Sequence, residues 1–178
     1  MSGWTGAQCS VYFPYGPQTN VNEAKVTSGG WTKCHSESMA PRHQHVLDPI
    51  MRKCSKSKLI LGCRKVGSST IANAAPNGKE ALQITGDNGQ IINGSKWYRK
   101  NGRIGNKPPY NATGNSYGFV HESSEMEFQR PYPEVDSGAT KAEMRLSYYL
   151  AGPGGWSRCG GRTKLFDNGW EKLYYHAD

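Results

Sequence analysis

The stretch "KLILGCRKV" at residues 58–66 decides the fold class of this chain of 178 residues. Leu59, Leu61 and Cys63 occupy every second position, which is the period that places side chains on one face of a β-strand. A short apolar run with this period, bounded by cations, favours a core strand. We therefore expect this segment to lie at the centre of the fold.

Working outward, short segments rich in aromatic and β-branched residues recur along the chain and predict further strands. They are "SVYF" (10–13), "KVT" (25–27), "WTKC" (31–34), "STIANAA" (69–75), "EALQIT" (80–85), "KWYRK" (96–100), "SYGFV" (116–120), "MRLSYYL" (144–150), "WSRC" (156–159) and "WEKLYYH" (170–176). The chain has 22 Gly and 10 Pro, so turns are dense. We predict an all-β fold with minor α, a single-domain antiparallel sandwich or barrel of short strands.

One short helix is expected near residues 49–55, because Asp48 is a suitable N-cap and Pro49 suits the first helical position. No linker divides the chain, so residues 1–178 are expected to form one domain, with 1–15 as a loosely ordered N-terminal arm. No apolar run approaches the roughly 20 residues of a membrane span, so no membrane insertion is expected. No signal peptide is visible in the first 20 residues.

The five cysteines are Cys9, Cys34, Cys54, Cys63 and Cys159, and none forms a C-x-x-C pair. In an oxidising compartment an odd count leaves one thiol over. The pairing that we expect is Cys34 with Cys54 and Cys63 with Cys159, which leaves Cys9 free or paired with another chain. Spacing does not determine connectivity, however, and in a cytosolic protein all five would be buried small apolar residues.

The hexapeptide "GGWTKC" (29–34) returns as "GGWSRC" (154–159). The sequences that follow the two copies diverge at once, which argues against a tandem repeat. We interpret each copy as the start of a strand, with a glycine turn, a buried Trp and an interior or crosslinked Cys. Trp31 and Cys34 are three residues apart, so a bulge or burial on both faces must accommodate them. The two copies are expected to lie close together, joining the early and late parts of the sheet.

The order of the motifs resembles a Trp/Cys/Gly-rich domain of uncharacterised, mostly extracellular proteins. The resemblance covers about residues 16–176 and runs through "GGWTKC", "LILGCRKVGSST", "NGSKWY", "YGF", "MRLSYY", "GGWSRCG" and "WEKLYY". That family has a further cysteine pair where this chain reads "VDSG" (135–138) and "LSYY" (146–149). The resemblance implies an extracellular location and no particular activity.

The chain contains no G-x-S-x-G, H-E-x-x-H, P-loop or dinucleotide-binding motif. We therefore expect a protein that is not an enzyme and binds no cofactor. His43 and His45 share a face if they lie on a strand and are weak candidates as metal ligands. No third ligand supports them at a standard spacing, so we expect no metal site.

The net charge is +8, and all of the positive excess lies before residue 116, which suggests a basic face for a polyanion. The candidate polyanion-binding residues form two runs, Arg52, Lys53, Lys56, Lys58, Arg64 and Lys65, then Lys96, Arg99, Lys100, Arg103 and Lys107. The candidate aromatic contacts are Trp97, Tyr98, Tyr148 and Tyr149, which could stack on sugar rings or nucleic-acid bases.

Two sequons, at Asn93 and Asn111, lie in polar loops where a glycosylation acceptor would be exposed. Together these features favour a non-enzymatic, extracellular recognition or structural (matrix) module. Its partner would be a glycan or another polyanionic surface, and it could self-assemble into a homo-oligomer or filament. The alternative is a polyanion-binding protein whose ligand is single-stranded nucleic acid, a sulfated glycan or a charged mineral such as silica.

Overall fold

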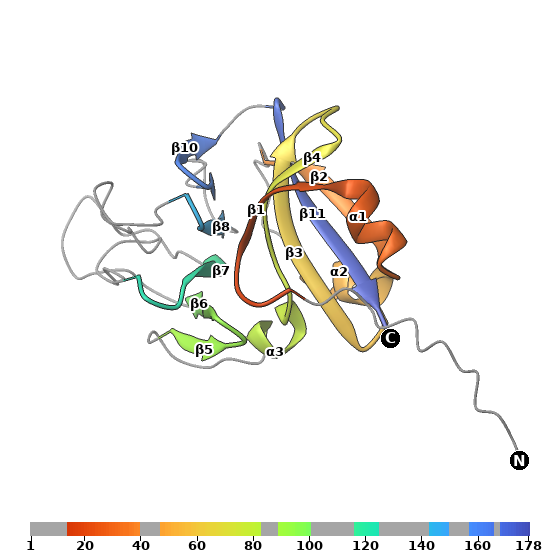
Figure 1. The fold of residues 1–178 in the computed structure, drawn as a ribbon, viewed down its shortest axis with the longest axis horizontal. Helices are drawn as coiled ribbons and strands as arrows, with labels where there is room; N and C mark the ends of the chain where they lie inside the picture. The colour runs from red at the N-terminus through yellow and green to blue at the C-terminus, as the bar shows by residue number, and fades with distance from the viewer. Residues whose placement is uncertain are drawn as a thin grey trace, which may run out of the picture.

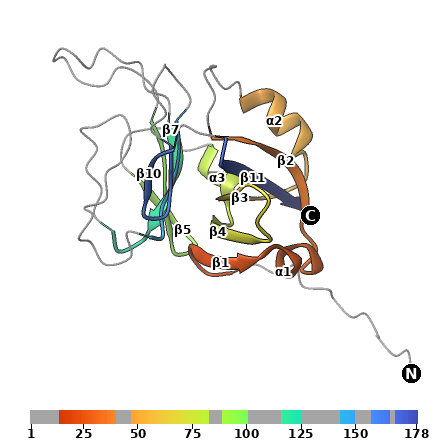
Figure 2. The same cartoon turned by 90° about the horizontal axis from the view of Figure 1, so that it is seen from above.

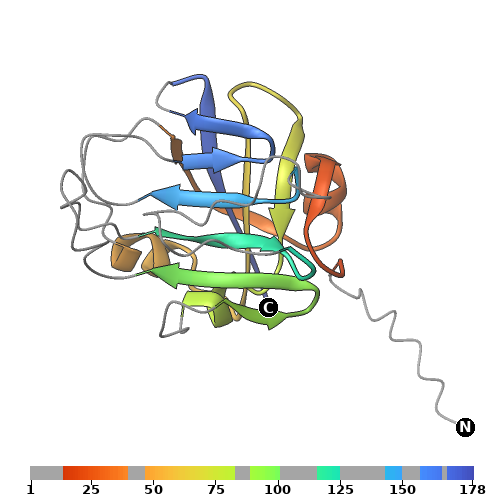
Figure 3. The same ribbon diagram turned by 90° about the vertical axis from the view of Figure 1, so that its left-hand side faces the viewer.

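Two antiparallel sheets pack as a sandwich in the computed structural model (Figure 1). Sheet A has the order β1 (Gln18–Asn22), β4 (Thr70–Ala75), β3 (Lys58–Lys65), β11 (Trp170–Ala177), β2 (Thr32–Ser38). Sheet B has the order β10 (Arg162–Leu165), β9 (Ser157–Cys159), β8 (Leu146–Tyr149), β7 (Ser116–His121), β6 (Ser95–Lys100), β5 (Gln90–Ile92). Figure 3 shows the strands of sheet B crossing those of sheet A steeply. The structure describes residues 14–39, 47–82, 89–100, 116–124, 143–149, 157–165 and 168–178. The predicted all-β sandwich with minor α is confirmed.

Strands β3 and β11 form the centre of sheet A, so the central position that we expected for residues 58–66 is confirmed. They pair along their whole length, from Trp170 opposite Lys65 to Ala177 opposite Lys58. Leu61 and Cys63 of β3 face sheet B, whereas Ile60 faces the opposite side of sheet A. Both faces are buried, which explains why the run is almost continuously apolar.

Two hydrophobic cores therefore flank sheet A. The inter-sheet core is formed by side chains of both sheets and α2, including Met39, Ile50, Leu59, Leu61, Ala75, Trp97, Tyr117, Phe119, Leu146, Tyr148, Leu165 and Tyr174. The outer core lies under α1 and contains Val21, Val26, Trp31, Ile60, Ile71, Ala74, Leu173, Tyr175 and Ala177. Figure 1 shows sheet A between sheet B and α1.

Two segments that were expected to be strands are helical at least in part. The triplet "KVT" lies in α1 (Glu23–Ser28), where the Asn22 side chain accepts a hydrogen bond of 2.8 Å from the Ala24 amide and caps the helix. Its one buried residue, Val26, packs on the outer core. The first residues of "EALQIT" lie in α3 (Gly78–Leu82). The left-handed Asn77 (φ 71°) ends the preceding extended segment.

Helix α2 spans Leu47–Lys53, so the predicted helix exists but begins about two residues earlier. Asp48 consequently lies inside the helix and is not its N-cap. Figure 2 shows α1 beside β1 and α2 beside β2, at opposite edges of sheet A. The segment "SVYF" lies outside the described residues, as does Cys9.

Both expected disulfides are present. Cys34–Cys54 joins β2 to the residue that follows α2, with a sequence separation of 20. Cys63–Cys159 joins β3 of sheet A to β9 of sheet B across a separation of 96 residues. Two intrachain disulfides indicate an oxidising environment. In the described part of the chain, no helix is long and apolar enough to span a membrane.

The described parts of the two hexapeptides lie in different sheets, β2 and β9, so they do not join one sheet as expected. Their common role is to bring a cysteine to the inter-sheet core. Trp31 lies in the outer core and Cys34 packs against the inter-sheet core, so two-sided burial accommodates their spacing. A bulge is present as well, because Tyr174 opposes His35 and Tyr175 opposes Lys33, which leaves Cys34 as the extra residue.

The two disulfides should contribute unequally to stability. In the chain-entropy model, closing the longer loop restricts the unfolded state more, which gives about 5 kcal/mol for Cys63–Cys159 and about 3 kcal/mol for Cys34–Cys54. We expect guanidinium unfolding of the Cys63→Ala/Cys159→Ala variant to show the larger loss. Equal losses in the two double variants, with the remaining disulfide verified by mass, would contradict this order.

Candidate functional site

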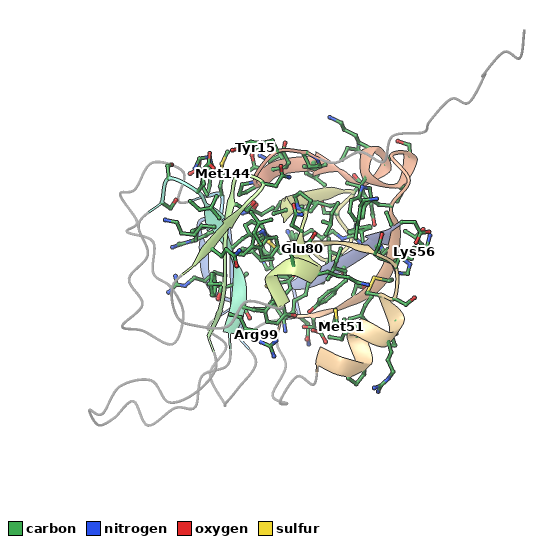
Figure 4. The ribbon with its side chains drawn as sticks, turned by 90° about the horizontal axis from the view of Figure 1, so that it is seen from below. Tyr15, Met51, Lys56, Glu80, Arg99 and Met144 are labelled. Carbon is green, nitrogen blue, oxygen red and sulfur yellow. A yellow bond between two sulfur atoms is a disulfide. The ribbon has the colours of Figure 1, made fainter. Side chains whose placement is uncertain are left out.

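Five cations lie on α2, the connection after it, the start of β3, and α3, and we call them the basic corner: Arg52, Lys53, Lys56, Lys58 and Lys79. Arg52 and Lys53 lie in the last turn of α2, where cations complement the helix dipole. Lys56 belongs to the connection and Lys58 begins β3, while Lys79 comes from α3. Figure 4 shows Lys56 at the right-hand edge of the molecule, whereas Arg99 lies at its lower side.

Hydrogen bonds hold the basic corner together. The Lys79 ammonium donates to the Ser55 carbonyl at 3.1 Å, which ties α3 to the connection after α2. Lys56 forms an ion pair of 3.1 Å with Asp178, and Lys58 donates to the Asp178 carbonyl. Arg52 and Lys53 are exposed. The corner thus combines anchored lysines with two cations that face solvent.

The imidazole of His176 lies within the electrostatic influence of Lys56, Lys79 and Asp178. Burial and the charges of Lys56 and Lys79 lower the pKa of its imidazole, although Asp178 acts in the opposite direction. Burial is the largest cause of this shift, and the two lysines add to it.

Arg64 and Lys65 do not belong to the basic corner, although they lie in the same run of the sequence. They are at the opposite end of β3 from Lys58. Arg64 is 8 % exposed and is enclosed by two carboxylates, so it is not a polyanion-binding residue. It pairs with Glu171 at 2.5 Å and with Glu23. Lys65 is exposed but distant from the other cations.

The second predicted basic run does not form an aromatic platform. Trp97 is fully buried in the inter-sheet core, where its ring meets Phe119 edge-on at 5.1 Å. Tyr98 is buried on the other face of β6, and its hydroxyl donates to the Leu146 carbonyl at 3.1 Å. Gly118 lies under Tyr98, and a Cβ there would come within 2.0 Å of the Leu146 carbonyl oxygen.

Tyr148 is also fully buried, so three of the four candidate aromatic contacts are core residues. The prediction of aromatic contacts was wrong for these three, because both faces of sheet B are buried at these positions. Lys96 is half-buried and donates to the Ser124 carbonyl at 2.6 Å, and Arg99 is half-buried as well. The side chains of Lys100 and Tyr149, and residues Arg103, Lys107, His43, His45 and Asn111, lie outside the described part.

Asn93 is not the exposed glycosylation acceptor that we expected. With Gly94 it forms the two-residue turn between β5 and β6, both at positive φ (47° and 76°). Its side-chain amide donates to the Pro14 carbonyl at 3.0 Å, and Ser95 of the same sequon is fully buried. The nitrogen that would carry the glycan is therefore engaged in the fold.

The last residues of the predicted N-terminal arm are fixed by this turn. The Gly16 amide donates to the Asn93 carbonyl at 2.8 Å, and the Tyr15 hydroxyl donates to Glu122 at 3.1 Å. Residues 1–13 lie outside the described part. Of the residues expected in the arm, Tyr15 is therefore held against the fold.

A buried polar network between the sheets was missed by sequence reasoning. The hydroxyls of Tyr117 and Tyr174 are 2.6 Å apart, and the Tyr148 hydroxyl donates to the Gly62 carbonyl. Lys172 is fully buried, with its ammonium 5.4 Å from the Tyr148 ring centroid and 3.4 Å from Glu37. Burial lowers the pKa of Lys172, and Glu37 opposes this shift. The sequence feature that could have indicated this network is the recurrence of Tyr at core positions of the predicted strands.

Comparisons of the chain with protein families, curated proteins and solved structures find no match. The family resemblance therefore stays a prediction. Within the described ranges, no three His, Cys, Asp or Glu side chains converge as a metal site. The candidate site rests on its own geometry, and two of the cations of the basic corner, Arg52 and Lys53, face solvent.

The buried tyrosines predict unfolding at alkaline pH. Burial raises the pKa of Tyr98, Tyr117, Tyr148, Tyr174 and Tyr175 above the usual 10. Their stabilising contribution is complete below pH 10 and is lost above it, by about 1.4 kcal/mol per tyrosine and pH unit. The lowered pKa of Lys172 acts oppositely but is a single group.

We therefore expect cooperative loss of the far-ultraviolet circular dichroism signal as the pH rises above 10, together with a jump in tyrosinate absorbance. Complete tyrosine ionisation in a chain that keeps its β-sheet signal would contradict the burial.

Glu23 predicts a second loss of stability, in acid. Burial opposes its ionisation, but hydrogen bonds from Lys33, Tyr175 and Arg64 outweigh burial and lower the pKa of Glu23 to about 2. A depressed carboxyl pKa stabilises the fold above about pH 4.5, and this contribution is lost as the pH falls towards 2. We expect a loss on the order of 2 kcal/mol, allowing for partial solvent screening.

Urea unfolding between pH 6 and pH 2.5 measures this effect. Glu23→Gln should be less stable at pH 6 and should depend less on pH than the unsubstituted protein. Parallel pH profiles for the two proteins would refute the assignment.

Proposed function

We propose that this chain is a non-enzymatic, extracellular recognition module that binds a sulfated glycan through the basic corner. The observation that carries the proposal is that five cations lie on adjoining segments, namely α2, the connection after it, the start of β3, and α3, which Lys79 ties to that connection. Sulfate groups offer the dense negative charge that such a cluster attracts. The two disulfides support an extracellular location, because such bonds persist in oxidising compartments.

Charge recognition is favoured over stacking by the burial of the aromatic residues. Single-stranded nucleic acid and neutral sugars are bound largely through exposed aromatic faces. Trp97, Tyr98 and Tyr148 are at most 2 % exposed, so they offer no such face. A sulfated glycan needs only the cations, which is why we favour it over nucleic acid. Binding to a charged mineral such as silica is tested by comparing retention on silica with retention on heparin.

Self-assembly through strand edges receives less support. Edge strand β1 contains Asn20 at φ 53°, and edge strand β2 carries the bulge at Cys34. Irregular edges of this kind disfavour pairing with a strand of another molecule. The features that support a function are therefore the charges and not the edges.

Salt-dependent retention on heparin tests the proposal. Arg52→Gln/Lys53→Gln removes the two exposed cations of α2, and each lost contact should reduce the slope of log affinity against log salt by about 1. The matched control is Lys25→Gln/Lys65→Gln, which makes the same change in net charge at exposed positions of α1 and the far end of β3.

The expected result is weaker retention for the first variant and unchanged retention for the control. Equal weakening of both would show that net charge alone is responsible and would overturn the assignment to this corner. Stronger retention on single-stranded DNA or silica than on heparin would overturn the choice of a sulfated glycan.

A further inference from the structure

We propose that His35 and Glu37 bind a divalent transition-metal ion such as Zn²⁺ at the outer edge of sheet A. This site is independent of the basic corner. Both residues lie on β2, an edge strand that pairs only with β11 among the described strands. They follow the bulge at Cys34 and are two residues apart, so they share the face that looks towards Tyr174 and Lys172.

The distance between the two side chains fits a shared metal ion better than a hydrogen bond. His35 Nε2 and Glu37 Oε2 are 3.5 Å apart, beyond the usual N–H···O range. His35 Nε2 is nevertheless buried and has no hydrogen-bond partner, which is costly for a polar atom. Two ligand atoms each about 2.1 Å from a tetrahedral Zn²⁺ are separated by about 3.4 Å.

Neighbouring residues hold both ligands in place. The other carboxylate oxygen of Glu37 lies 3.4 Å from the Lys172 ammonium, which orients Oε2 towards His35. The His35 ring packs against the Tyr174 ring at a centroid distance of 5.4 Å. Residues that orient metal ligands in this way raise the affinity of a site. The side chains of His35 and Glu37 are 18 % and 19 % exposed, so the ligands lie just below the surface.

The donor set determines the class of metal. One imidazole nitrogen and one carboxylate oxygen suit Zn²⁺ or Cu²⁺, whereas Ca²⁺ and Mg²⁺ prefer sites made of oxygen alone. No third His, Cys, Asp or Glu of the described ranges joins the pair. Zinc sites usually have three or four protein ligands, so a site with two, completed by water, predicts weak affinity and an ion that exchanges readily.

Calorimetric titration of the metal-free protein with Zn²⁺ tests the site. We expect binding that is weakened at least tenfold in His35→Gln and in Glu37→Gln, both of which preserve side-chain size. The matched control is His121→Gln, a histidine at the end of β7. Zn²⁺ should also shift the His35 imidazole signals in the NMR spectrum and leave heparin retention unchanged.

Unchanged Zn²⁺ affinity in His35→Gln overturns the proposal. So does loss of binding in His43→Gln/His45→Gln when His35→Gln still binds, because the ion would then be held elsewhere. Since heparin retention and Zn²⁺ binding are measured separately, failure of the metal site leaves the proposed function intact, and the reverse also holds.

Discussion

Burial of sheet A on both faces is the constraint on which the rest of this structure depends. Only 35 % of the residues are hydrophobic, yet one sheet must supply side chains to the inter-sheet core and to the outer core. The chain meets this demand with tyrosines and half-cystines in addition to aliphatic residues. Each buried tyrosine brings a hydroxyl that needs a partner. The polar network of Tyr117, Tyr148 and Tyr174 is therefore a consequence of composition.

The central strands could be predicted because their signal is local. In β3 the alternation of Leu59, Leu61 and Cys63 with Ile60 reflects two buried faces, and the same period is visible in β11. The helices α1 and α3 were less predictable. "KVT" has the apolar–polar alternation of a strand, but the Asn22 cap and the packing of Val26 under sheet A decide for a helix. Capping and tertiary burial of one residue override a three-residue pattern.

The candidate site could be predicted only where neighbours in sequence stay neighbours in space. Arg52, Lys53, Lys56 and Lys58 are held together because a helix end and a strand start adjoin. Arg64 lies on the same strand as Lys58, but Glu23 and Glu171 surround it, and these come from near the two ends of the described chain. No local pattern reports such a long-range ion pair. The sequence likewise predicts that Trp97 and Tyr98 are exposed, whereas the structure buries both faces of β6 at these residues.

The ion pairs of sheet A also explain why positive charge collects at one corner. Glu23 forms ion pairs with Lys33 and Arg64. Glu37 pairs with Lys172, and Glu171 pairs with Arg64. These acidic side chains are thus engaged by cations of sheet A, while Asp178 contacts Lys56 and Lys58 at the basic corner.

The Cys34–Cys54 bond then links the end of α2 to β2, directly after Arg52 and Lys53. A backbone crosslinked at this point has less freedom to lose when a ligand binds, so Arg52 and Lys53 are presented on a preorganised frame.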